Sequence, residues 1–101
     1  MPKWADYAIT AVRYSSDPKH IEAVQACPDD GERLGSASIQ SRATVIVALG
    51  GETTYVTAYK NAEGKWSKGE DVQVVVVQGE KFIRSDANSK AADNLGNLPT
   101  F

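Results

Sequence analysis

The sequence contains one cysteine, Cys27, and one histidine, His20, among its 101 residues. A single cysteine cannot form a disulfide within the chain, so we expect a reducing compartment and a cytoplasmic protein. A cysteine nucleophile needs a base beside it, and acid–base catalysis near neutral pH most often uses histidine. The sequence therefore predicts no enzyme, and we expect Cys27 to be a small buried residue at the end of a strand.

Long apolar runs are missing as well. The longest cover residues 45–49 and 74–77, far below the ~20 residues that a membrane helix needs. The N-terminus lacks the apolar core of a signal peptide, and no phosphate-binding loop of the Gly-x-x-x-x-Gly-Lys type is present. The 11 basic and 13 acidic side chains nearly cancel, which gives no general attraction to nucleic acid or membranes. We therefore expect neither a membrane nor extended nucleic acid as a partner.

The composition that remains is that of one globular domain over residues 1–101, with 42% hydrophobic and 24% charged residues. Alternating apolar side chains predict strands, and residues 28–40 are expected to form a loop. The fold class that follows is α+β, with the order ββαβββ: a mainly antiparallel sheet of about five strands with one helix packed on it. An irregular tail at 86–101 completes the chain. The predicted strands are residues 7–14, 20–27, 53–60, 71–78 and 82–85.

The predicted helix covers residues 41–49. Ser41 can accept a hydrogen bond from the first turn, and Gly50 or Gly51 can adopt the left-handed conformation that ends many helices. The β-branched run at 44–47 favours a strand instead. A strand at this position therefore remains the alternative.

Several segments together carry a resemblance to known sequences. They are residues 9–13, 41–42, 64–69, 82–88 and 93–101, which read Ile-Thr-Ala-Val-Arg, Ser-Arg, Gly-Lys-Trp-Ser-Lys-Gly, Phe-Ile-Arg-Ser-Asp-Ala-Asn and Asp-Asn-Leu-Gly-Asn-Leu-Pro-Thr-Phe. They resemble a family of small uncharacterised bacterial and phage proteins, a domain of unknown function. The resemblance implies a single domain with a helix after Ser41, and it brings no mechanism.

The end of the last predicted strand carries the first candidate site. Arg84, Asp86 and Asn88 alternate, so an extended chain presents them on one side. A guanidinium binds phosphate or carboxylate, and Asp and Asn can hydrogen-bond to ribose or to a base edge. The alternative is structural: Arg84 pairs with Asp86 or Asp93, and Asn88 caps a turn. Asp86 and Asn88 also resemble the start of a calcium loop, but its glycine and closing glutamate are missing, so we predict no metal.

The second candidate site is the predicted turn around Trp66. An indole flanked by Lys65 and Lys68 can stack on a base while the ammonium groups contact phosphate, although a solvated hairpin tip is the simpler alternative. Asn94 in the tail and Arg13 are two further candidates for contact with an anion. The candidate ligand-binding residues are therefore Arg84, Asp86, Asn88, Asn94, Trp66, Lys68 and Arg13.

These residues favour a non-enzymatic binding module for a small anionic ligand, such as a nucleotide or cyclic nucleotide, with no cofactor. The resemblance to a family with phage members extends this to sequestration of an immune nucleotide signal, an anti-defence role. We expect a homo-oligomer, because one domain of this size offers little concave surface. The alternative is a protein-interaction or assembly module that acts through a sheet edge or through the C-terminal tail.

Overall fold

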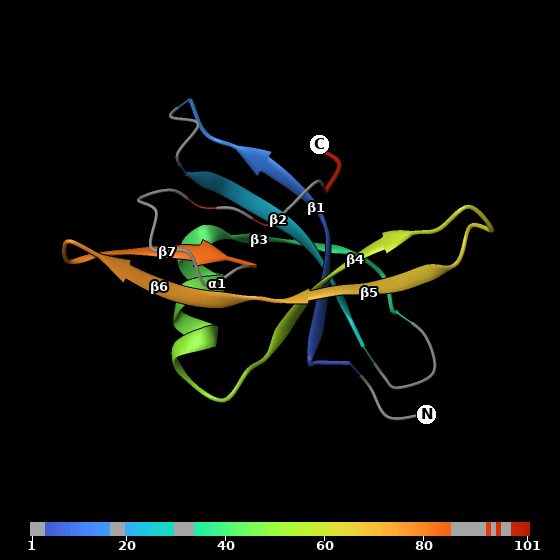
Figure 1. The fold of residues 1–101 in the computed structure, drawn as a ribbon, viewed down its shortest axis with the longest axis horizontal. Coiled ribbons are helices and arrows are strands. Elements are labelled where there is room, and N and C mark those ends of the chain that lie inside the picture. The colour runs from blue at the N-terminus through green and yellow to red at the C-terminus, as the bar shows by residue number, and fades with distance from the viewer. Residues whose placement is uncertain (1–3, 17–19, 30–33, 86–92, 94, 96–97) are drawn as a thin grey trace.

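The computed structural model describes residues 4–16, 20–29, 34–85, 93, 95 and 98–101. In this part, a five-stranded sheet has the order β3-β2-β1-β4-β5, and β6 and β7 form a separate two-stranded sheet (Figure 1). The α+β class is confirmed. The elements are β1 (Tyr7–Tyr14), β2 (Ile21–Pro28), β3 (Ser38–Ser41), α1 (Arg42–Gly50), β4 (Tyr55–Lys60), β5 (Trp66–Asp71), β6 (Gln73–Val77) and β7 (Glu80–Arg84).

The larger sheet is mixed, which corrects the expectation of a mainly antiparallel sheet. β1 and β2 form the predicted antiparallel pair, but β1 pairs with β4 in parallel, from Tyr7 with Tyr55 to Ile9 with Thr57. The chain reaches β4 through α1, and a helical connection can return a strand to the same end of a sheet from which an earlier strand started. The strand predicted at 71–78 corresponds to β6, whereas β5 was not predicted as a strand, and the two belong to different sheets.

The segment before α1 contains a strand that the sequence analysis missed. β3 pairs with β2 in antiparallel register, Ser38 opposite Ala26 and Ser41 opposite Ala23, where we expected a loop. β3 shows no alternation of buried and exposed side chains, so it is held mainly by its main-chain hydrogen bonds. A strand of this kind leaves little signal in a sequence.

The helix is confirmed, and one of its two predicted caps is wrong. The Ser41 side chain accepts a hydrogen bond from the Thr44 N–H at 3.2 Å. At the other end Gly51 has φ −98°, outside the left-handed region, and its N–H bonds to the Ala48 carbonyl. Nine residues long, α1 is too short for a bilayer, and no other helix in the described segments has the length and apolar content to cross one.

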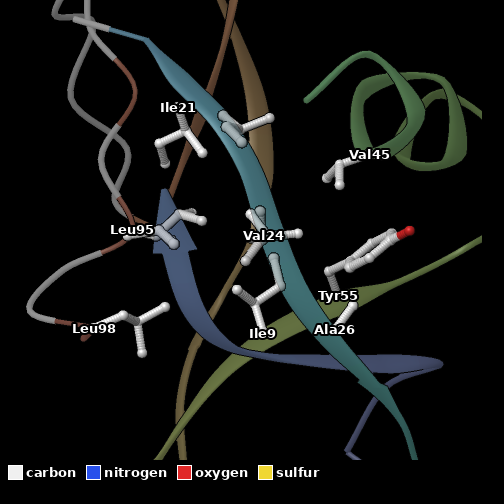
Figure 2. Packing of buried hydrophobic residues seen from close by; sticks show 11 residues of the cluster. Ile9, Ile21, Val24, Ala26, Val45, Tyr55, Leu95 and Leu98 are labelled. Carbon is white, nitrogen blue, oxygen red and sulfur yellow. The ribbon is translucent and has the colours of Figure 1, made fainter. Parts of the chain in front are cut away.

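The main core lies on one face of the five-stranded sheet. Figure 2 shows Val24 of β2 between Leu95 on one side and Val45 of α1 with Tyr55 on the other. Leu95 and Leu98 are buried in this cluster, so these two leucines anchor the tail on the sheet. The opposite face carries a smaller cluster of small side chains, namely Ala5, Ala8, Val56 and Ala58. The buried residues of the main cluster are Ile9, Val12, Ile21, Val24, Ala26, Val45, Tyr55, Val72, Ile83, Leu95 and Leu98.

Candidate functional site

The structure places the predicted site residues in different environments. Arg84 is the last residue of β7 and is only 2% exposed, so in this conformation it presents no surface to a ligand. Arg13 is exposed on β1, but its guanidinium lies 4.5 Å from the centre of the Phe101 ring, and its Nε donates to the Phe101 main-chain oxygen at 3.3 Å. The predicted residues Asp86, Asn88 and Asn94 lie outside the described residues.

Trp66 and Lys68 lie together on the β4–β5 hairpin, which projects from the body of the protein (Figure 1). Two residues apart on one strand, they share a face. The cross-strand partner of Trp66 is Lys60, whose Nζ lies 5.3 Å from the centre of the indole ring. We call Lys60, Trp66 and Lys68 the hairpin cluster. The Lys68 ammonium lies 3.7 Å from the Asp71 carboxylate. The cluster combines an exposed indole with two lysines on the same face of the hairpin.

The turn that carries the hairpin cluster is ordered by its own hydrogen bonds. The Asn61 side-chain oxygen accepts from the N–H groups of Glu63 at 2.9 Å and Lys65 at 3.1 Å. The main chain closes the loop, since the Asn61 N–H donates to the Lys65 carbonyl at 2.8 Å. Gly64 takes φ +78°, a conformation that other residues adopt at a cost. The hairpin therefore holds Lys60 and Trp66 in register without a ligand.

Asp93 is a buried residue that the sequence analysis did not select as functional. Its fully buried carboxylate accepts hydrogen bonds from the N–H groups of Ile21 at 2.8 Å and Ile83 at 2.9 Å. It also forms an ion pair with Arg42, 2.6 Å from Nε. Of the two partners considered for Arg84, Asp93 is thus paired with Arg42, and Asp86 lies outside the described residues. Because the partners of Asp93 come from β2, β7 and α1, we assign this residue a structural role in fixing the tail.

His20 and Cys27 do not form a catalytic pair. The His20 Nε2 lies 2.8 Å from the Glu80 carboxylate, and its ring stacks on Phe82. Cys27 is 5% exposed, near the end of β2, with its Sγ 4.0 Å from the Thr10 hydroxyl; its predicted burial is confirmed. His20 directly precedes the other end of β2, so about 23 Å of strand separates the two residues.

Three clefts lie between described residues, with volumes of about 600, 640 and 440 Å³. The last lies against the base of the hairpin and includes Tyr59, Leu95 and Leu98. The lining residues of these three clefts include no lysine, arginine or histidine. An anion therefore finds better electrostatic complementarity at the hairpin cluster than in any of them.

Sequence reasoning found two of the three cluster residues. Trp66 and Lys68 stand out because they are close in sequence. Lys60 becomes their neighbour only through the β4–β5 register. In the sequence, only the alternating strand pattern before the Asn61 turn indicates that Lys60 could face Trp66.

Together these features define a small α+β domain that carries an exposed basic and aromatic hairpin. A family model described as "Protein of unknown function (DUF3892)" matches residues 8–99, and the chain belongs to this family. Comparison with curated proteins and with solved structures gave no match.

Proposed function

We propose that the protein is a non-enzymatic binding module for a small anionic ligand of the nucleotide class, and that the ligand binds at the hairpin cluster. The observation that carries the proposal is the cross-strand pair of Lys60 and Trp66, with Lys68 on the same face. A base stacks on the indole, since every base has a π-face that an aromatic side chain can cover. The two ammonium groups then contact phosphate as point charges.

Binding at this site requires one local rearrangement. Lys60 now lies over the Trp66 ring, where a base would stack. Its flexible stem lets the ammonium group leave the ring and follow the phosphate. The cation–π contact is thus replaced by a charge–charge contact, and the ligand gains the exposed indole face.

The finer role follows from the ligand class. A module that binds a nucleotide or cyclic nucleotide without turning it over lowers the free concentration of that molecule. The resemblance to a family with phage members supports sequestration of an immune signal, an anti-defence role. This step rests on analogy between related sequences, and the hairpin geometry supports only the ligand class.

Calorimetric titration with a panel of mononucleotides and cyclic nucleotides at low ionic strength tests the proposal. We expect at least one nucleotide to bind, with affinity that falls as salt is added. Trp66→Ala is expected to weaken that binding by about 5- to 150-fold, the range for loss of one stacked base. Lys60→Gln and Lys68→Gln should each weaken it as well.

Lys81→Gln is the matched control, because it removes one exposed positive charge on β7, away from the hairpin cluster. It should leave affinity almost unchanged. Absence of heat with every nucleotide of the panel would overturn the proposal, as would an equal loss of affinity in Lys81→Gln.

A second candidate function is assembly through the edge strand β3. On one side β3 pairs with β2, and no described strand pairs with its other side. Its residues carry no charge, and Ile39 is 61% exposed, whereas protected edges commonly carry lysine or proline. Two copies could join their β3 edges around a two-fold axis, the commonest symmetry of soluble oligomers.

Light scattering over a range of protein concentrations tests this assembly. We expect a dimer that Ile39→Lys converts to a monomer. Val47→Lys, at an exposed position of α1, is the control and should remain dimeric. A wild-type protein that stays monomeric at every concentration would exclude the assembly.

A further inference from the structure

The cleft of about 600 Å³ lies where β4 begins and where β5 passes into β6. Its volume is within the range of sites for small molecules. The loop between α1 and β4 forms one wall. The lining residues are Trp4, Ala5, Leu49, Gly51, Glu52, Thr53, Thr54, Tyr55, Val56, Asp71, Val72, Gln73 and Val74.

The cleft has an apolar floor and an aromatic rim. Ala5, Val56 and Val72 are each buried to more than 90%, so their apolar atoms are shielded beneath the opening. Trp4 is the lining residue with the largest aromatic side chain, and 37% of its surface is exposed. Leu49 and Val74 also line the cleft and are partly exposed, so they offer the apolar surface over which the aliphatic part of a ligand can replace water.

The charged residues that line the cleft are all acidic. Glu52 and Asp71 line it, and the adjoining cleft shares Glu52 and adds Asp6 and Asp29. Neither cleft has a lysine, arginine or histidine among its lining residues. Asp71 also forms an ion pair with Lys68, whose Nζ is 3.7 Å from Asp71 Oδ1. This end of the protein is therefore complementary to a cation.

Hydrogen bonds fix two of these carboxylates in place. Asp6 accepts from the Thr54 N–H at 2.9 Å, and Asp29 accepts from the Trp4 N–H at 2.6 Å. Across the residues that the structure describes, no three Asp, Glu, His or Cys side chains come close enough to hold a metal ion. The separated carboxylates suit an extended organic cation better than a compact metal ion.

We propose that this cleft binds an arginine side chain of a basic peptide segment. The guanidinium lies against the Trp4 ring, as cations do on aromatic faces, and donates hydrogen bonds to Glu52 or Asp71. The aliphatic stem of the arginine packs on the apolar floor beside Leu49 and Val74. This site is distinct in charge and in residues from the anion site at the hairpin cluster.

Fluorescence titration of the Trp66→Phe variant tests the proposal, because Trp4 is then the sole tryptophan. The probe is a capped tri-arginine peptide, and the same peptide with citrulline in place of arginine is the neutral comparison. We expect a saturable change with the arginine peptide and none with the citrulline peptide. Glu52→Gln and Asp71→Asn should each weaken binding at least threefold.

Glu22→Gln is the matched control, since Glu22 is an exposed acid on β2 that does not line either cleft. It should leave binding unchanged. A flat titration, equal binding of the citrulline peptide, or an equal loss in Glu22→Gln would each overturn the proposal.

Lys68→Gln separates this site from the hairpin cluster. It removes a cation beside Asp71, so it should strengthen binding of the arginine peptide while it weakens nucleotide binding. Failure of nucleotide binding alone leaves the peptide result unaffected, so the two proposals can fail independently.

Discussion

The carboxylate of Asp93 accepts two hydrogen bonds from the Arg42 guanidinium, at 2.6 Å from Nε and 3.1 Å from Nη2, across 51 residues of sequence. The same Nη2 donates to the Lys81 carbonyl at 2.6 Å. Asp93 also receives the main-chain N–H groups of Ile21 and Ile83. One buried side chain thus ties the tail to the start of α1, to β2 and to β7.

Replacing Asp93 should strongly lower the stability of the fold. Asp93→Asn removes the negative charge and turns an amide N–H₂ toward groups that are themselves donors, so at least one donor loses its acceptor. We expect the free energy of unfolding to fall by about 3–5 kcal/mol, the cost of breaking a buried ion pair. Urea unfolding measures this. Asp71→Asn, the same change at a side chain that is 82% exposed, should stay within about 0.5 kcal/mol of wild type.

The double variant Asp93→Asn/Arg42→Gln adds a test of coupling. If the two side chains act as a pair, the double variant loses less than the sum of the single losses. Strict additivity would contradict the assigned role of Asp93, as would a loss no larger than that of Asp71→Asn.

Tyr55 should make stability fall at high pH. Burial raises the pKa of its phenol above the ordinary value, and Tyr7 and Asp6 raise that pKa further. The folded protein then holds this proton more tightly than the unfolded chain. The resulting stability is complete below about pH 10, the unfolded pKa, and is lost as pH rises through the higher folded pKa.

Tyr55→Phe separates this effect from other alkaline titrations. The variant loses the hydrogen bond from the Tyr55 hydroxyl to the Gln40 side-chain oxygen, at 2.6 Å, which costs about 1 kcal/mol at neutral pH. Above pH 10 it should lose less stability than wild type does. Urea midpoints measured from pH 8 upward show the difference, and parallel curves for the two proteins would contradict the prediction.

Gly69 is required by its close approach to Thr57. A Cβ atom at Gly69 would lie 2.2 Å from the Thr57 hydroxyl oxygen, which also accepts the Glu70 N–H at 2.9 Å. Gly69→Ala should therefore lower the free energy of unfolding by about 1–3 kcal/mol. Gly50→Ala, where the same atom meets nothing within 4 Å, should raise it by up to about 1 kcal/mol.

Thermal unfolding of the two alanine variants gives the comparison. Thr57→Ala combined with Gly69→Ala should recover part of the loss, because the hydroxyl that clashes is gone. Equal stability of the Gly69→Ala and Gly50→Ala variants would show that the Thr57 contact is not restrictive.

The elements that the sequence predicts well are those with a local signal. Residues 7–14 are rich in apolar side chains on both faces of the strand, and Ser41 supplies a side-chain cap, so β1 and α1 follow from neighbouring residues alone. β3 has no such pattern. β5 is mostly polar and has no buried residue, so it also leaves little signal, and the parallel pairing of β1 with β4 depends on how α1 crosses the sheet.

The residues of the candidate site were likewise predictable only where they lie close together in the sequence. Trp66 and Lys68 are close in sequence and could be selected together, whereas Lys60 joins them only through strand register. The partner of Asp93 is 51 residues away, and no local pattern links the two. The burial of Arg84 also depends on tertiary structure. Its position at the end of a strand predicts the direction of the side chain but not which residues cover it.

The turn between β6 and β7 offers the last prediction. Gln78 has φ +51° and Gly79 has φ +82°, as in the two-residue hairpin turns that favour Asn-Gly. A glutamine in the left-handed region costs about 1–2 kcal/mol, and asparagine tolerates this region better. Gln78→Asn should therefore raise the free energy of unfolding by about 0.5–1 kcal/mol, while Gly79→Ala should lower it. Urea unfolding decides this, and a loss of stability in Gln78→Asn as large as that in Gly79→Ala would refute the assigned turn geometry.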